Sequence, residues 1–255
     1  NINNYFLVYI QYLKTTGSGD SAVSSSEYFA IKKFTLKLVN GVMTKNIVHA
    51  ITNTNNYDNR AISSIIIESE NVIVVYFVKT GPNLVAKSYD YELNEKKEIQ
   101  VSSFTVEQGK GTFFEGFYLD NSFTAVIYYL DKSSPSKLWI KLYKYDSTNG
   151  FNEKFYREIN KYTLKYDLEY NDVYRISKYR VIFTCKYEGN DGNKLYIYLF
   201  DFYSEYTKII VTMYYFGVSN YNLKKEMASY MLNGYTLFTS TISTSNTYSI
   251  LIYFG

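Results

Sequence analysis

The sequence predicts an all-β fold made of repeated four-stranded units, and three observations lead to that prediction. Aromatic residues make up 19% of the 255 residues, with 31 Tyr and 17 Phe, and such side chains favour the half-buried surface of a pleated sheet. Apolar segments, polar turns and aromatic-rich segments recur at intervals of about fifty residues. Helical periodicity is scarce, and only residues 222–230 suggest a helical turn or two.

The two middle strands of each unit carry the clearest signal, an apolar segment followed by a polar loop and an aromatic-rich segment. The successive pairs cover residues 6–13 and 28–38, 72–78 and 84–93, 123–130 and 138–145, 181–187 and 195–202, and 235–242 and 248–254. Residues 72–78 and 124–130 are apolar on both faces, so we expect neighbouring sheets to cover them on both sides. Residues 138–145 alternate more, which predicts a position further out in their sheet.

Flanking segments predict an inner and an outer strand for most units. A short strand and a tight polar turn precede each of the last four pairs, and the short strands cover residues 62–67, 113–119, 173–176 and 227–232. A fourth strand follows each of the first four pairs, at residues 47–52, 98–106, 155–164 and 208–216. Asn71, Asn121 and Asn233 lie in the tight turns, where a positive φ angle is expected.

Four strands per unit at this period are typical of β-propeller blades. The five blade units cover about residues 1–52, 62–106, 112–164, 172–216 and 227–255, which makes the chain one propeller domain or part of one. Over nearly its whole length the chain resembles β-propeller repeat proteins. The resemblance is architectural, because the sequence has no Trp-Asp dipeptide, no kelch double glycine and no sialidase box. It therefore implies the fold and no subfamily, and a β-sandwich or a solenoid remains an alternative.

The first and last units are incomplete. With strands numbered outwards from the propeller axis, the first unit lacks strand one and the last unit stops after strand three. An open sheet edge favours aggregation. We therefore expect the chain to be part of a larger propeller, completed by further sequence or by another subunit.

Composition excludes several classes of protein. A net charge of +3 is too small to predict a nucleic-acid-binding protein. One Cys and one His exclude both a Cys/His zinc site and a disulfide within the chain, and no cofactor is expected. No apolar run is long enough to span a membrane. The sequence has no Asn-x-Ser/Thr glycan acceptor, which favours an extracellular or cell-surface protein, with a cytoplasmic location as the alternative.

Long loops on one face of the predicted propeller are the expected binding surface, because binding residues concentrate on loops held by a rigid scaffold. These loops cover residues 14–27, 53–61, 131–137, 188–194 and 217–226. The candidate contact residues on them are Tyr57, Asp58, Arg60, Asp191 and Tyr221. The expected partner is another protein, either a second copy or a larger parent chain, and a glycan stacked on exposed Tyr is also open.

No residue pattern predicts a catalytic or metal site. His49 and Cys185 lie within apolar strands and are interpreted as structural. We therefore expect a non-catalytic structural or interaction module of a larger surface, secreted or assembly protein. The enzyme alternative is a glycoside hydrolase that uses carboxylates near the axis, and the candidates are Glu68, Glu115, Asp120 and Asp172. An intracellular protein-interaction platform is a further alternative.

Overall fold

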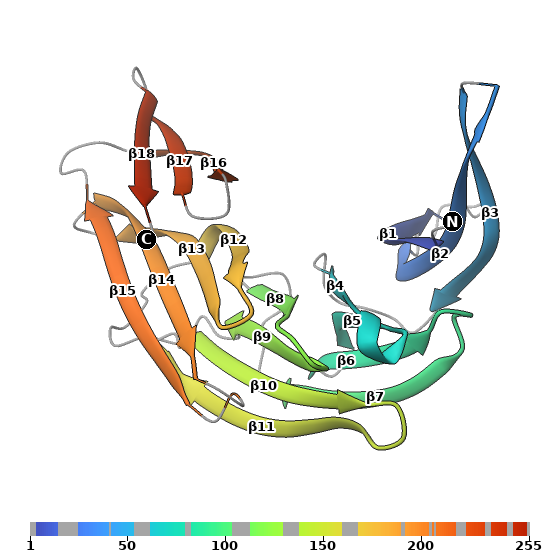
Figure 1. The fold of residues 1–255 in the computed structure, drawn as a ribbon. Helices are drawn as coiled ribbons and strands as arrows, with labels where there is room; N and C mark the ends of the chain where they lie inside the picture. The colour runs from blue at the N-terminus through green and yellow to red at the C-terminus, as the bar shows by residue number, and fades with distance from the viewer. Residues whose placement is uncertain are drawn as a thin grey trace, which may run out of the picture. The chain divides into compact units, whose positions relative to one another are not determined.

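The computed structural model confirms the all-β prediction (Figure 1). It describes residues 4–14, 25–40, 42–53, 62–79, 83–103, 113–129, 138–159, 168–189, 192–203, 206, 208–217, 223–232, 236–243 and 247–253. Within these residues η1 is a single 3₁₀ turn over Glu68–Glu70, and Tyr206 also has 3₁₀ geometry.

The strands form five separate antiparallel sheets in which neighbours in sequence are neighbours in space. Sheet 1 contains β1 (Asn4–Lys14), β2 (Ser25–Val39) and β3 (Val42–Asn53). Sheet 2 contains β4 (Ile62–Ile67), β5 (Val72–Lys79), β6 (Asn83–Asp90) and β7 (Glu95–Ser103). Sheet 3 contains β8 (Phe113–Tyr118), β9 (Phe123–Tyr129), β10 (Leu138–Asp146) and β11 (Gly150–Glu158).

The last two sheets repeat the pattern. Sheet 4 contains β12 (Leu168–Ser177), β13 (Arg180–Gly189), β14 (Gly192–Phe202) and β15 (Ile209–Gly217). Sheet 5 contains β16 (Leu223–Leu232), β17 (Thr236–Ser243) and β18 (Thr247–Tyr253). Four consecutive antiparallel strands per sheet are the topology of a β-propeller blade, and the predicted fold class is confirmed. As predicted, the first and last sheets have three strands each in the described part of the chain.

Two predicted elements are corrected. Residues 222–230, where a helical turn was expected, lie largely in β16, which pairs with β17 through a register shift between Leu223 and Met227. The good helix formers in this segment are outweighed by pairing within a sheet. The outer strand expected at 155–164 begins earlier, at Gly150, because Gly150 adopts a φ of +82° and closes a tight turn after β10.

The chain divides into two compact units. The first comprises residues 1–127 and 143–153, and the second comprises residues 128–142 and 154–255. Sheets 1 and 2 belong to the first unit, sheets 4 and 5 to the second, and sheet 3 contributes residues to both.

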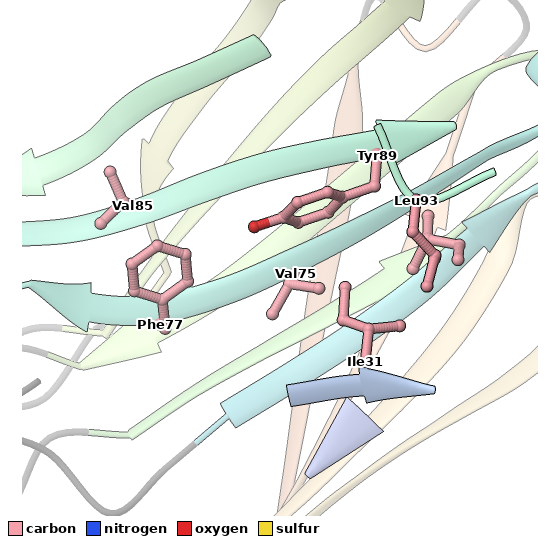
Figure 2. Packing of buried hydrophobic residues seen from close by; sticks show 7 residues of the cluster. Ile31, Val75, Phe77, Val85, Tyr89 and Leu93 are labelled. Carbon is pink, nitrogen blue, oxygen red and sulfur yellow. The ribbon is translucent and has the colours of Figure 1, made fainter. Parts of the chain in front are cut away.

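The core of the first unit includes an apolar layer between sheets 1 and 2. Figure 2 shows Ile31 of β2 beside Val75 of β5, with Phe77, Tyr89 and Leu93 in the same layer. All side chains of β5 from Val72 to Val78 are buried, so this strand is covered on both faces as expected. Each Å² of apolar surface that is removed from water stabilises the folded chain by about 25 cal/mol. Such layers are therefore the main source of stability for stacked sheets.

The opposite face of sheet 2 packs on sheet 3. The ring of Tyr76, fully buried, lies against Gly116 of β8, where a Cβ atom would come within 2.3 Å of the ring. The hydroxyl of Tyr145 donates a hydrogen bond of 3.1 Å to Oγ of Ser88 on β6. A glycine at position 116 therefore lets the two sheets approach closely.

The second unit has its own core. Val181, Ile182 and Phe183 of β13 and Ile197 and Phe200 of β14 are buried. These two strands are the middle strands of sheet 4, so burial again concentrates at the centre of a blade.

Candidate interaction surface

The loop residues predicted to bind a partner lie outside the described part of the chain. This holds for all five, Tyr57, Asp58, Arg60, Asp191 and Tyr221. Their role as contacts therefore stays a prediction.

The candidate axial carboxylates occupy different positions, and one of them joins two inner strands. Glu68 is exposed in η1, Asp120 lies in the turn after β8, and Asp172 lies in β12 with its side chain outside the description. Glu115 of β8 accepts a hydrogen bond of 3.1 Å from Oγ of Ser63 on β4. The same Oγ accepts a 3.0 Å hydrogen bond from the backbone N–H of Gly116, so this polar contact links neighbouring blades.

Glu70, which the sequence analysis did not single out, links three turns. Its Oε1 accepts a 2.7 Å hydrogen bond from Oγ of Ser122, and its Oε2 accepts a 3.1 Å hydrogen bond from the backbone N–H of Ser147. Ser122 lies in the β8–β9 turn and Ser147 in the β10–β11 turn, so Glu70 ties the β4–β5 turn to the neighbouring sheet. Charge-assisted hydrogen bonds of this kind position elements firmly.

Two aspartates stabilise the turns between the third and fourth strands. Oδ1 of Asp90 accepts hydrogen bonds from the backbone N–H groups of Glu92, at 2.9 Å, and Asn94, at 2.8 Å. The pKa of Asp90 lies below its usual value. Desolvation by burial would raise this pKa, but the hydrogen bonds from Asn94 and the nearby Lys96 ammonium outweigh that effect. Asp146 is arranged in the same way, and hydrogen bonds from Asn149 and then Thr148 lower its pKa.

The repeated aspartate could have been found in the sequence. Tyr89-Asp90 is followed by Asn94, and Tyr145-Asp146 is followed by Asn149, at equivalent places in two units. An Asp that accepts bonds from the next backbone N–H groups is a common turn device.

The described side chains contain no group of three or more His, Cys, Asp and Glu that could hold a metal ion. No helix among the described residues is long and apolar enough to cross a membrane.

The described feature most suited to binding is one face of sheet 1. Alternate residues of a strand point to opposite faces. Phe6 and Val8 of β1 and Ile31 of β2 pack on the apolar layer against sheet 2, so the residues between them point the other way. We call this second face the outer face of sheet 1, and it comprises Tyr5, Leu7, Lys32, Phe34, Lys45 and Ile47.

The outer face is apolar and exposed. Tyr5 is 39% exposed, Leu7 45% and Ile47 50%, in contrast to the fully covered strand β5. The strand register places Tyr5 opposite Phe34, and Phe34 opposite Ile47, so these side chains form one row across the three strands. Tyr5 and Phe34 stack with ring centroids 5.7 Å apart. Exposed apolar side chains gathered in one row make this face a candidate interaction surface.

The outer face is also basic. Nζ of Lys32 lies 5.0 Å from the ring centroid of Tyr9, and Nζ of Lys45 lies 5.2 Å from that of Phe34. The described side chains of sheet 1 include no carboxylate. The surface therefore offers ammonium groups and apolar side chains together, which suits a partner that carries both carboxylates and apolar groups.

Comparison with known proteins assigns no family. No protein-family model matches the chain, and no curated protein matches it. Among solved structures, the chain is similar to AofleA from Arthrobotrys oligospora, with 8% identity, a TM-score of 0.44 and coverage of 91% of this chain and 66% of that one. For a triple arginine-to-alanine mutant of AofleA the identity is again 8%, the TM-score 0.39 and the coverage 100% and 87%.

The WD40 domain of SCAP from fission yeast is also similar, with 9% identity, a TM-score of 0.34 and coverage of 98% of this chain and 72% of that one. At these values the similarities assign no function. The fold class rests on the described sheets themselves.

Proposed function

We propose that the chain is a non-catalytic interaction module that binds another macromolecule through the surfaces of its β-sheet blades. The outer face of sheet 1 is the observation that carries the proposal, because its exposed apolar row is the kind of surface that a stable soluble blade normally covers. A protein is the favoured partner, and the exposed Tyr side chains keep a glycan as the alternative. The loop residues around Tyr57 and Asp191 remain expected contacts.

The carboxylates with described partners support the choice of a module over a hydrolase. Glu115 bonds to Ser63, Glu70 bonds to Ser122, and Asp90 holds its own turn. The bonds of Glu115 and Glu70 position neighbouring sheets, and those of Asp90 close a turn within one sheet. A scaffold role accounts for these groups without a substrate.

We further propose that the module acts outside the cell or at its surface, with the cytoplasm as the alternative. The support is the lack of Asn-x-Ser/Thr acceptors in a chain rich in Asn, Ser and Thr. Fractionation of the producing cells, followed by detection with an antibody to the chain, tests this location.

Site-specific photo-cross-linking tests the main proposal. Benzoylphenylalanine replaces Leu7 in one variant and Ile210 in a control, because Ile210 of β15 is similarly exposed, at 41%, and lies on another sheet. In an extract of the producing organism, we expect the Leu7 position to cross-link to a macromolecule with a yield several times that of Ile210. Equal yields would remove the support for the outer face as a binding surface.

A second arm tests the hydrolase alternative. The full chain is incubated with a broad panel of glycans, and Glu115→Gln serves as the comparison variant. We expect no hydrolysis above the buffer control. Hydrolysis that Glu115→Gln abolishes would replace the interaction module with the enzyme.

A further inference from the structure

The lysines of sheets 1 and 2 differ in how their charge is balanced. Lys33 points toward sheet 2, and its Nζ lies 2.6 Å from Oε1 of Glu92. Lys87 of β6 is paired with Glu95 at 2.7 Å, and Lys96 with Asp90 at 3.0 Å. Lys32 and Lys45, on the outer face, lie instead over aromatic rings.

We propose that the outer face of sheet 1 docks an acidic amphipathic segment of another protein. Carboxylates of the segment pair with Lys32 and Lys45, and its apolar side chains cover Tyr5, Leu7 and Ile47. The inference rests on the proposed function and names the chemistry of the partner at that same surface.

The opposite face of the same sheet shows how such a contact is built. There the apolar side chains Phe6, Val8 and Ile31 pack on sheet 2, and Glu92 of the covering sheet supplies the carboxylate for Lys33. The outer face has the same two components, an apolar row and lysines. It therefore matches a covering element that brings its own carboxylates.

Charge also selects against a second copy of this face. Two outer faces brought together would place Lys32 and Lys45 of both copies in one contact, without a carboxylate from the described side chains of sheet 1. Like charges in a desolvated contact are strongly unfavourable. An acidic partner removes this cost and adds ion pairs next to apolar surface.

The size of the face fits a single segment. Three strands about 4.8 Å apart give a surface about 10 Å wide, which is close to the diameter of one α-helix with its side chains. The apolar row runs across all three strands, and one lysine lies on β2 and the other on β3.

Binding of a defined probe tests the proposal. The probe is a fluorescent amphipathic peptide with Leu and Phe at its apolar positions and Glu at its polar positions, and its twin carries Lys in place of Glu. The full chain is titrated into each peptide, and fluorescence anisotropy is recorded at low and at high salt. We expect the Glu peptide to bind at least about tenfold more tightly than the Lys peptide, and salt to weaken it.

Charge reversal locates the binding surface. The double variant Lys32→Glu/Lys45→Glu is expected to lose about tenfold or more in affinity for the Glu peptide. The matched control is Lys144→Glu/Lys178→Glu, because Lys144 of β10 lies over Phe123 and Lys178, in the turn after β12, lies over Tyr179, so both also lie over aromatic rings but away from sheet 1. The control is expected to bind as the unaltered chain does, and thermal melts confirm that both variants fold.

Five results overturn the proposal. Four of them come from binding: no binding of the Glu peptide, equal binding of the two peptides, unchanged affinity in the Lys32/Lys45 variant, and preferential binding of an anionic polysaccharide with loss in that same variant. The fifth is a homodimer in sedimentation that Leu7→Glu dissociates, because a second copy then covers the face. The proposed function survives any of these results if Leu7 still cross-links more than Ile210, and it fails if the two positions cross-link equally.

Discussion

A single glycine sets how closely sheets 2 and 3 approach. Gly116 of β8 faces the buried ring of Tyr76, and a Cβ atom there would lie 2.3 Å from Cε2 and 2.6 Å from Cδ2. Burial raises the pKa of Tyr76 well above its usual value, so the side chain remains a neutral phenol that packs like a large apolar group. Only a residue without a side chain fits against it.

Gly116→Ala is therefore expected to destabilise the chain. The added methyl group forces the Tyr76 ring or the β8 backbone to move, at a cost of about 1–3 kcal/mol in the free energy of unfolding. Urea denaturation measures the loss. Ser64→Ala, an exposed position on β4, is the control and is expected to change stability by less than about 0.5 kcal/mol. A loss as small as the control would show that the ring moves aside freely.

Asp90 is expected to make stability depend on acid pH. Its pKa in the folded state is lowered, so the stabilisation is present above the unfolded pKa of about 3.9 and is lost as pH falls through the folded pKa. Asp90→Asn should cost about 1 kcal/mol at pH 7, because the bonds to Asn94 weaken and Lys96 loses its partner.

Thermal melts of both proteins at pH 7 and near pH 3 test this dependence. The difference between the unaltered chain and Asp90→Asn should shrink as pH falls below about 4. A difference that is the same at both pH values would contradict the role of the ionised carboxylate in the turn.

At the scale of elements, truncation should cost more stability on one face of β1 than on the other. Phe6 packs on the layer between sheets 1 and 2, with its ring centroid 5.1 Å from that of Tyr91. Leu7, its neighbour, is on the outer face. We expect Phe6→Ala to cost about 2–3 kcal/mol and Leu7→Ala less than about 1 kcal/mol, measured by chemical denaturation.

The pair of variants checks the assignment of faces directly. Each substitution serves as the control for the other, because the two residues are adjacent and belong to one strand. Equal losses would mean that the outer face is covered in the free chain, which would also remove the basis for partner binding there.

The order of strands within each blade was predictable from the sequence. The residues at which the strands end were harder to predict, and the turns show why. The apolar segments at 72–78 and 123–130 correspond closely to β5 and β9, because a strand buried on both faces has a composition that no exposed segment shares. The third strand of sheet 2 ends at Asp90 and not at residue 93, since the carboxylate of Asp90 closes the turn. Such a local hydrogen bond leaves little trace in hydrophobic periodicity.

At the scale of the whole molecule, protection should vary strongly between blades. All side chains of β5 from Val72 to Val78 are buried, whereas on β18 Leu251 is 65% exposed and Tyr253 73%. Amides in strands with many buried contacts open only with the whole unit, and those in exposed edge strands open locally.

Hydrogen exchange followed by mass spectrometry tests this gradient. We expect peptides that contain β5 to exchange slowest and those that contain β18 to exchange among the fastest of the described strands. A β18 as protected as β5 would show that another element covers the last strand in solution.

The sequence by itself determined the fold class, because the period and polarity of segments along the chain indicate repeated antiparallel sheets. It also named candidate contacts on loops, which the structure does not describe. Only the tertiary structure decided that Phe6 and Leu7 have different roles and that Glu115 bonds to Ser63. The physical reason is that a face or a hydrogen bond between blades depends on which sheet lies opposite, and that information is absent from local sequence pattern.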